Sequence, residues 1–263
     1  MESREQEQYG ELLFSHAHTQ EVARLEALAD ALDQGTFQDL QRLPLRQGWR
    51  CLDVGAGLGT VGAWLARRCS SGNVVMADRD PRHLRSRAGR NVGVRQFDVT
   101  LDEFPEGSFD LIHARWLLSH LPSRQTVVER MVRWLAPGGW LVIEDLARFP
   151  LEAVRDPLYR KVSLAMCDAV GRRIGTDCHW ARTLPEPLRA AGLTSVHAEV
   201  RISTVGPTPI GRFWRLSAEQ LALDLRRDFG VTPGELVAFI RKVTASDFTA
   251  PGLATVAAAG QRT

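Results

Sequence analysis

The chain has 263 residues, of which 44% are apolar and 24% are charged, and these proportions are typical of a globular protein with a substantial core. A formal net charge of +2 is too small to favour nucleic acid or an anionic membrane as a partner. The four cysteines lack the paired spacing of a zinc site, and no apolar run approaches the ~18 residues of a membrane span. We therefore expect a soluble, cytoplasmic protein without a metal site.

A helical pattern opens the chain over residues 11–33, and Gly35 is expected to end this helix before a short one over 36–43. From there to residue 146, short apolar stretches alternate with helical ones. The predicted strands are 49–54, 74–77, 92–97, 109–114 and 140–143, and the predicted helices are 61–68, one that opens at Pro81, and 124–135. This alternation predicts a parallel sheet with right-handed crossovers.

The pattern changes after residue 146. Residues 150–192 and 209–246 are expected to be mostly helical, 195–205 a long strand, and 253–259 the last strand. The cluster of arginines between Arg79 and Arg90 is expected to lie on a solvated helix face.

The loop after the first strand fits two kinds of ligand. Gly57, Gly59 and Gly62 match the dinucleotide fingerprint G-x-G-x-x-G, and Asp78 follows Gly57 by about the spacing of a ribose-binding acid. The same loop also reads as an acid, Asp53, followed by alternate glycines. A carboxylate at that position would repel a pyrophosphate but suits the ammonium and sulfonium of S-adenosylmethionine (SAM). We therefore favour SAM.

Further motifs follow in order, and together they resemble the class I SAM-dependent methyltransferases, particularly small bacterial enzymes that act on small molecules. The resemblance is strong over about 45–146 and weak elsewhere. The matching segments are 51–60, 74–78, 96–99, 104–112, 117–122 and 135–139. The family implies an α/β, Rossmann-like sheet of seven strands with the last one, 253–261, antiparallel. It also implies an N-terminal helical lid over 1–45, a SAM-binding domain over 46–263, and cap insertions at about 150–192 and 207–246.

The resemblance also implies the residues of the cofactor site. Asp78 would hold the ribose hydroxyls, Asp98 would take the adenine amino group, and the backbone of Val99 would meet the ring. Tyr9 and Arg24 would reach the methionine carboxylate from the lid. The remaining expected cofactor contacts are Asp53, Gly55, Ala56, Gly57, Arg79, Ala114 and Arg115.

Candidates for the chemistry are few. His16 and His18 lie on the segment that would fold over the cofactor. Arg115 follows the fourth strand and would either orient an acceptor oxygen or pair with an acid. His120 has either a structural or a catalytic role.

Other polar and apolar groups have open roles as well. His113 is expected to be a packed or hydrogen-bonded core residue. Glu144 and Asp145 would bind the acceptor, position a histidine or remain solvated. Residues 213–216 would line an apolar acceptor pocket or pack the cap against the core.

The predicted function is methyl transfer from SAM to a small molecule, with the acceptor atom and the oligomeric state left open. A basic stripe with interleaved aromatics is missing from the sequence, which argues against a nucleic-acid substrate. Two alternatives remain: a SAM-binding cyclase that transfers no methyl group, and an NAD(P)-dependent oxidoreductase.

Overall fold

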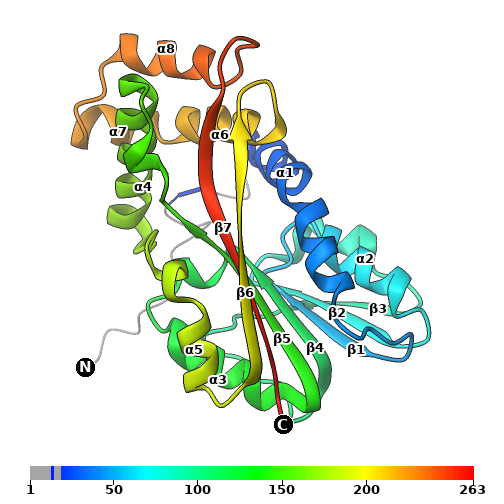
Figure 1. Ribbon diagram of the computed structural model, residues 1–263. Coiled ribbons are helices and arrows are strands. Elements are labelled where there is room, and N and C mark those ends of the chain that lie inside the picture. The colour runs from blue at the N-terminus through cyan, green and yellow to red at the C-terminus, as the bar shows by residue number, and fades with distance from the viewer. Residues whose placement is uncertain (1–12, 15–18) are drawn as a thin grey trace, which may run out of the picture.

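Residues 13–14 and 19–263 are described by a computed structural model, shown in Figure 1. Within these residues, seven strands form one sheet in the order β3-β2-β1-β4-β5-β7-β6. The strands are β1 (Arg50–Val54), β2 (Asn73–Asp78), β3 (Val92–Gln96), β4 (Phe109–Arg115), β5 (Leu135–Ala147), β6 (Thr194–Val205) and β7 (Ala250–Gln261). β7 runs antiparallel to β5 and β6, and the other neighbouring pairs are parallel. The predicted Rossmann-like sheet with an antiparallel last strand is confirmed.

Helices cover both faces of this sheet and one of its ends. They are α1 (Glu21–Gln41), α2 (Thr60–Arg68), α3 (Arg124–Trp134), α4 (Pro157–Ile174), α5 (Pro185–Ala190), α6 (Pro209–Gln220), α7 (Ala222–Asp228) and α8 (Pro233–Lys242). α1 and α2 lie on one side of the sheet, and α3 and α5 lie on the other (Figure 1). No helix of the described ranges has both the length and the apolar character needed to cross a bilayer.

The remaining helices form a cap where β6 and β7 extend beyond the other strands. α4, α6, α7 and α8 gather there, and α1 packs against α6 (Figure 1). Tyr159, Trp214 and Phe239 are buried in this cap, with the Tyr159 and Phe239 rings stacked at 5.9 Å. The expected insertion at 150–192 thus contributes α4 to the cap, whereas its second helix, α5, packs against β6 and β7.

Helix α1 continues through Gly35, so the predicted helix end at this glycine is wrong. Buried Leu32 and Leu40 pack on either side of it and outweigh the ~1 kcal/mol that a helical glycine costs relative to alanine. A Cβ at residue 35 would lie 2.5 Å from Nε of Arg201. The glycine therefore allows the long side chain of Arg201, on β6, to pass under the helix.

The helix predicted to open at Pro81 is also wrong. Two short 3-10 turns, Pro81–His83 and Arg85–Arg87, replace it. The Asp80 side chain caps the first turn by accepting from the backbone N–H of Arg82 at 3.2 Å. The arginines of this segment therefore form no helix face, although Arg82, Arg85, Arg87 and Arg90 are exposed to solvent as expected.

Candidate functional site

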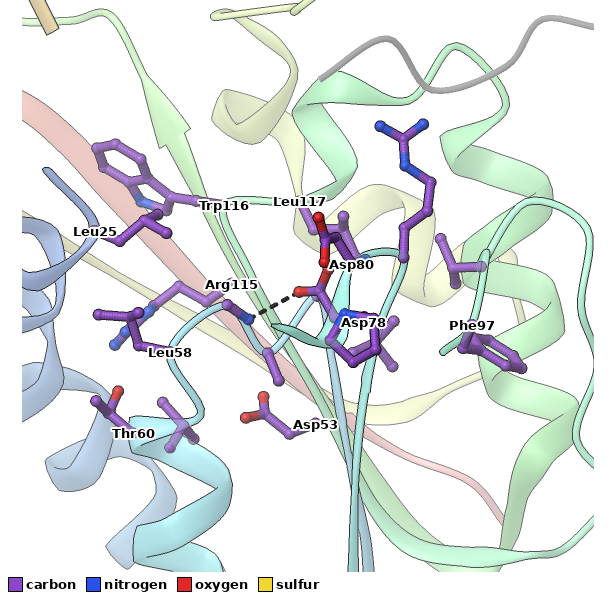
Figure 2. A pocket seen from close by; sticks show the side chains of 18 of the residues that line it. Leu25, Asp53, Leu58, Thr60, Asp78, Asp80, Phe97, Arg115, Trp116 and Leu117 are labelled. Atoms are coloured by element: carbon purple, nitrogen blue, oxygen red, sulfur yellow. Dashed lines mark hydrogen bonds between the residues drawn. The ribbon is translucent and has the colours of Figure 1, made fainter. Parts of the chain in front are cut away.

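A cleft opens at the carboxyl ends of β1, β2 and β4, where ligands bind in open α/β sheets (Figure 2). The loop between β1 and α2 lines it. This loop is fixed from behind because the N–H groups of Gly55 and Ala56 donate to Ala77 O at 2.8 and 3.2 Å. Gly57 has φ of +55°, and a Cβ there would meet no atom within 4 Å. The backbone at Gly57 can therefore approach a ligand closely.

Asp78 ends β2 and lies directly beside this loop. Its Oδ2 accepts from the N–H of Gly57 at 2.9 Å, and its Oδ1 accepts from the N–H of Asp80 at 3.0 Å. Figure 2 shows Asp78 and Asp80 between Phe97 on one side and Arg115 with Trp116 on the other. A carboxylate offers about four acceptor sites, and this chemistry suits a ribose diol.

Asp53, by contrast, is occupied within the protein. It is 3% exposed, and its Oδ2 accepts from the N–H of Gly62 at 2.9 Å, in the first turn of α2. Its Oδ1 lies 2.8 Å from Nδ1 of His113, its direct partner on β4. The carboxylate thus satisfies the N-terminus of α2, where a dinucleotide would place its pyrophosphate. This arrangement disfavours the dinucleotide reading of the glycine loop.

His113 links Asp53 to a second buried acid. Its Nε2 lies 3.2 Å from Oε1 of Glu144, and Oε2 of Glu144 accepts from Arg201, which also pairs with Asp39. Burial opposes the charged imidazole, but the hydrogen bonds to Asp53 and Glu144 outweigh it and raise the pKa of His113 to about 9. His113 is therefore cationic at neutral pH. The expectation of a hydrogen-bonded core histidine is confirmed, and Glu144 positions it.

Several expected cofactor residues do line the cleft: Asp53, Gly55, Ala56, Gly57, Asp78, Arg79, Val99 and Arg115. Asp98 is not among the residues that line the cleft, and its Oδ1 accepts from the N–H and the hydroxyl of Thr100 at 2.8 and 2.5 Å. Its expected contact with the adenine amino group stays a prediction. Ala114 is fully buried within β4 and is likewise not part of the lining. Tyr9, His16 and His18 lie outside the described residues.

Arg24 lies elsewhere than expected. Its guanidinium forms a bidentate pair with Glu21, at 2.9 and 2.7 Å, one turn earlier in α1. It lines a second, apolar cavity under the cap instead of the cofactor cleft. Glu21 in the same helix pairs with this guanidinium, and the expected contact of Arg24 with a methionine carboxylate stays a prediction.

Arg115 and His120 both reach the cleft. Arg115 pairs with Asp33 at 2.8 Å and donates to Thr36 at 2.9 Å, so it ties β4 to α1 as the acid-pairing alternative predicted. Nδ1 of His120 lies 2.7 Å from the hydroxyl of Thr176. Burial, with Arg24 and Arg124 nearby, lowers the pKa of His120 to about 3. Its imidazole is therefore neutral and only weakly basic.

Asp145 fixes the backbone of the segment that contains His120. Its Oδ2 accepts from the N–H of Ser119 at 2.9 Å, and its Oδ1 from the N–H of Leu146 at 2.8 Å. Burial raises the pKa of Asp145 to about 6 in spite of these bonds. It is fully buried, so the solvated alternative is wrong for this residue.

Sequence reasoning missed the residues that close the cleft. Leu25 and Leu28 come from α1, and Trp116 follows β4 (Figure 2). The leucines belong to an ordinary apolar helix face, which carries no signal for a ligand. Trp116 has φ of +51°, an uncommon conformation for a bulky side chain that clusters at functional sites. Its sequence neighbours do not predict that conformation.

Comparisons with known proteins place this chain among methyltransferases. Residues 52–143 match the family model of a methyltransferase domain. Methyltransferase str2 of Strobilurus tenacellus is 31% identical over 194 residues, which cover 72% of this chain and 70% of that protein. Methyltransferase str3 of the same organism is 32% identical over 127 residues, covering 48% of this chain and 46% of that protein.

More distant relatives share the fold. Phosphoethanolamine N-methyltransferase 1 of Arabidopsis thaliana is 27% identical over 172 residues, covering 63% of this chain but only 33% of its own length. The solved structure of the [4+2]-cyclase SpnF is 21% identical with a TM-score of 0.53, covering 88% of this chain and 81% of that one. Proteins similar to this chain therefore differ in the reactions that their names describe.

Proposed function

Because the chain belongs to the class I SAM-dependent methyltransferases, we propose that it transfers a methyl group from SAM to a small-molecule acceptor. The observation that carries this proposal is that two acids of the cleft occupy different positions and have different partners. Asp53 closes the N-terminus of α2 against a pyrophosphate, whereas Asp78 lies beside Gly57 where a ribose would bind. A nucleoside without a phosphate fits this pattern of charge.

The chain's own residues would mainly bind and orient the two reactants. SAM, when bound, supplies a methyl group that its sulfonium has already activated. Asp78 would hold the ribose, and the backbone of residues 55–57 would lie along the cofactor. Leu25, Leu28 and Trp116 would exclude water from the reacting atoms.

His120 would orient an acceptor rather than remove its proton. With a pKa of about 3, its imidazole stays neutral and is a weak base at neutral pH. Its place in the cleft suits a hydrogen bond to an acceptor hydroxyl. His16 and His18 stay predictions for a general base, and a cytoplasmic location stays one for the protein.

Titration calorimetry with S-adenosylhomocysteine tests the cofactor assignment. The Asp78→Asn variant should bind it about 10- to 100-fold more weakly, which is the usual loss for a hydrogen bond to a charged group. Asp247→Asn, an exposed acid on the turn before β7, is the matched control and should bind like wild type. Wild-type affinity in Asp78→Asn, or binding of NAD(H) but not of S-adenosylhomocysteine, would contradict the proposal.

A second assay separates methyl transfer from the cyclase alternative. With a deuterated methyl donor, a methylated product carries the label and one S-adenosylhomocysteine is released per turnover. A product isomeric with its substrate, formed without that release, would instead support a non-methylating enzyme. The likeness to SpnF favours neither outcome because it concerns the fold alone.

A further inference from the structure

We propose that the apolar cavity under the cap, next to the cofactor cleft, binds the acceptor, and that this acceptor is a small apolar molecule carrying one uncharged hydroxyl or carbonyl oxygen. This inference rests on the proposed methyl transfer and names its substrate class. The cavity lies among α1, α4, α6 and the segment after β4. Its wall is largely apolar and includes Leu146, Met166, Val170, Phe213 and Leu253.

The cavity meets the cofactor cleft at three side chains. Leu28, Trp116 and His120 line both spaces. Trp116 is fixed at this junction because its backbone N–H donates to Glu144 O at 2.7 Å and its Nε1 to the hydroxyl of Thr255 at 3.3 Å. Its ring also contacts Phe213 edge-on at 5.7 Å. These contacts stabilise the left-handed backbone conformation of Trp116, so its side chain has a fixed position between the two spaces.

The charge in the cavity wall is already neutralised. Among the described residues that line it, Arg24 carries the one permanent charge. Its guanidinium lies 4.1 Å from the ring centroid of Phe14 and 5.2 Å from that of Phe213, and it pairs with fully buried Glu21. Gln220 adds a hydrogen bond to the same carboxylate at 3.1 Å. A phosphate or carboxylate ligand would have to compete with Glu21 and leave that acid buried without its partner, which is strongly unfavourable.

Two polar side-chain atoms of the wall have no hydrogen-bond partner among the described residues, the hydroxyl of Ser217 and Nε1 of Trp214. Ser217 is 3% exposed, and no described residue forms a hydrogen bond with its hydroxyl. A buried hydroxyl without a partner costs about 1–3 kcal/mol, so such groups call for an explanation. Nearby, His120 is neutral and bonded to Thr176. The cavity therefore suits an apolar body with a neutral oxygen, and it does not suit phosphoethanolamine.

Ligand-observed NMR can test this class with small probes, using protein saturated with S-adenosylhomocysteine. The probes are p-cresol, toluene as its counterpart without the hydroxyl, and phosphoethanolamine. We expect p-cresol to bind saturably and about fivefold more tightly than toluene, which is the worth of one neutral hydrogen bond. In Ser217→Ala, the advantage of p-cresol over toluene should disappear. Phosphoethanolamine should not bind.

A larger substitution provides the control for site. Ser217→Met should fill the cavity and abolish binding of both aromatic probes, whereas Ser246→Met, on an exposed turn, should leave it unchanged. Retained S-adenosylhomocysteine binding shows that each variant is folded. If Ser217→Met does not fold, Ser217→Ala still tests the inference. Three results would overturn this inference alone: binding of S-adenosylhomocysteine but not of p-cresol, tighter binding of phosphoethanolamine than of p-cresol, or a p-cresol advantage that persists in Ser217→Ala. Loss of S-adenosylhomocysteine binding in the wild type would instead overturn the proposed function.

Discussion

Replacing His113 by leucine should destabilise the protein strongly. The substitution leaves two buried carboxylates, Asp53 and Glu144, without the cation that lies between them. The rise in the pKa of His113 from 6.5 to about 9 corresponds to about 3 kcal/mol, at about 1.4 kcal/mol per pKa unit. Removing one partner of a buried ion pair typically costs about 3–5 kcal/mol, in agreement with that figure.

The assay is urea unfolding at several pH values, followed by tryptophan fluorescence. Because the pKa of His113 is higher in the folded than in the unfolded state, its contribution is fully present below about pH 6.5. It is lost as the pH rises through about 9. Wild type should therefore lose stability between pH 6.5 and 9, and His113→Leu should lose less over the same range.

His197→Leu is the matched control, since His197 is exposed on β6. Its Nδ1 lies 3.1 Å from the carbonyl oxygen of Ser195, and its ring lies edge-on to Trp140 at 6.1 Å. This variant should change the free energy of unfolding by less than about 0.5 kcal/mol. A loss below about 1 kcal/mol in His113→Leu at pH 7, or a pH profile parallel to that of wild type, would refute the reasoning.

Two further substitutions probe the glycine loop and helix α1. Gly57→Ala forces an alanine into φ of +55°, which costs about 1–2 kcal/mol, and it should weaken S-adenosylhomocysteine binding in calorimetry. Gly234→Ala is the control: its Cβ also meets open space, but Gly234 has no positive φ, so binding should stay unchanged. Equal effects of the two would show that the loop backbone does not approach the ligand. Arg115→Met removes the arginine that pairs with Asp33 and leaves this acid only the hydroxyl of Thr60, so it should lower the free energy of unfolding by about 1–3 kcal/mol and speed amide exchange in α1. Unchanged exchange there would mean that this pair does not anchor the helix.

Strands β1, β2 and β4 could be predicted from the sequence because each contains a short, buried apolar run. The order of motifs from Asp53 to Gly139 identified the family in the same way. The hydrogen-bond partners of the side chains could not be predicted from the sequence, since they depend on the local geometry and on which segments pack together in the fold. Asp98 accepts a hydrogen bond from Thr100, two residues later, and Arg24 pairs with Glu21, three residues earlier.

Gly35 illustrates the other kind of failure. A glycine within an amphipathic pattern locally favours a helix end, and the sequence around it contains no contrary sign. The reason for the glycine lies 166 positions later, in the side chain of Arg201 that passes beneath it. The orphaned hydroxyl of Ser217 is likewise invisible in the sequence, because an amphipathic helix commonly carries serine.

Arg201 also bears on how this protein can be divided or recombined. It lies on the edge strand β6, yet it bonds Glu144 in the centre of the sheet and Asp39 on α1. A fragment that ends after β5 would contain every glycine and acid of the cofactor loop but would leave Glu144 without its arginine. The cofactor half therefore takes one of its buried ion pairs from β6, and we expect a chimera that carries the corresponding strand of a relative to keep Glu144 paired with a cation from that strand only if an arginine stands at the same position.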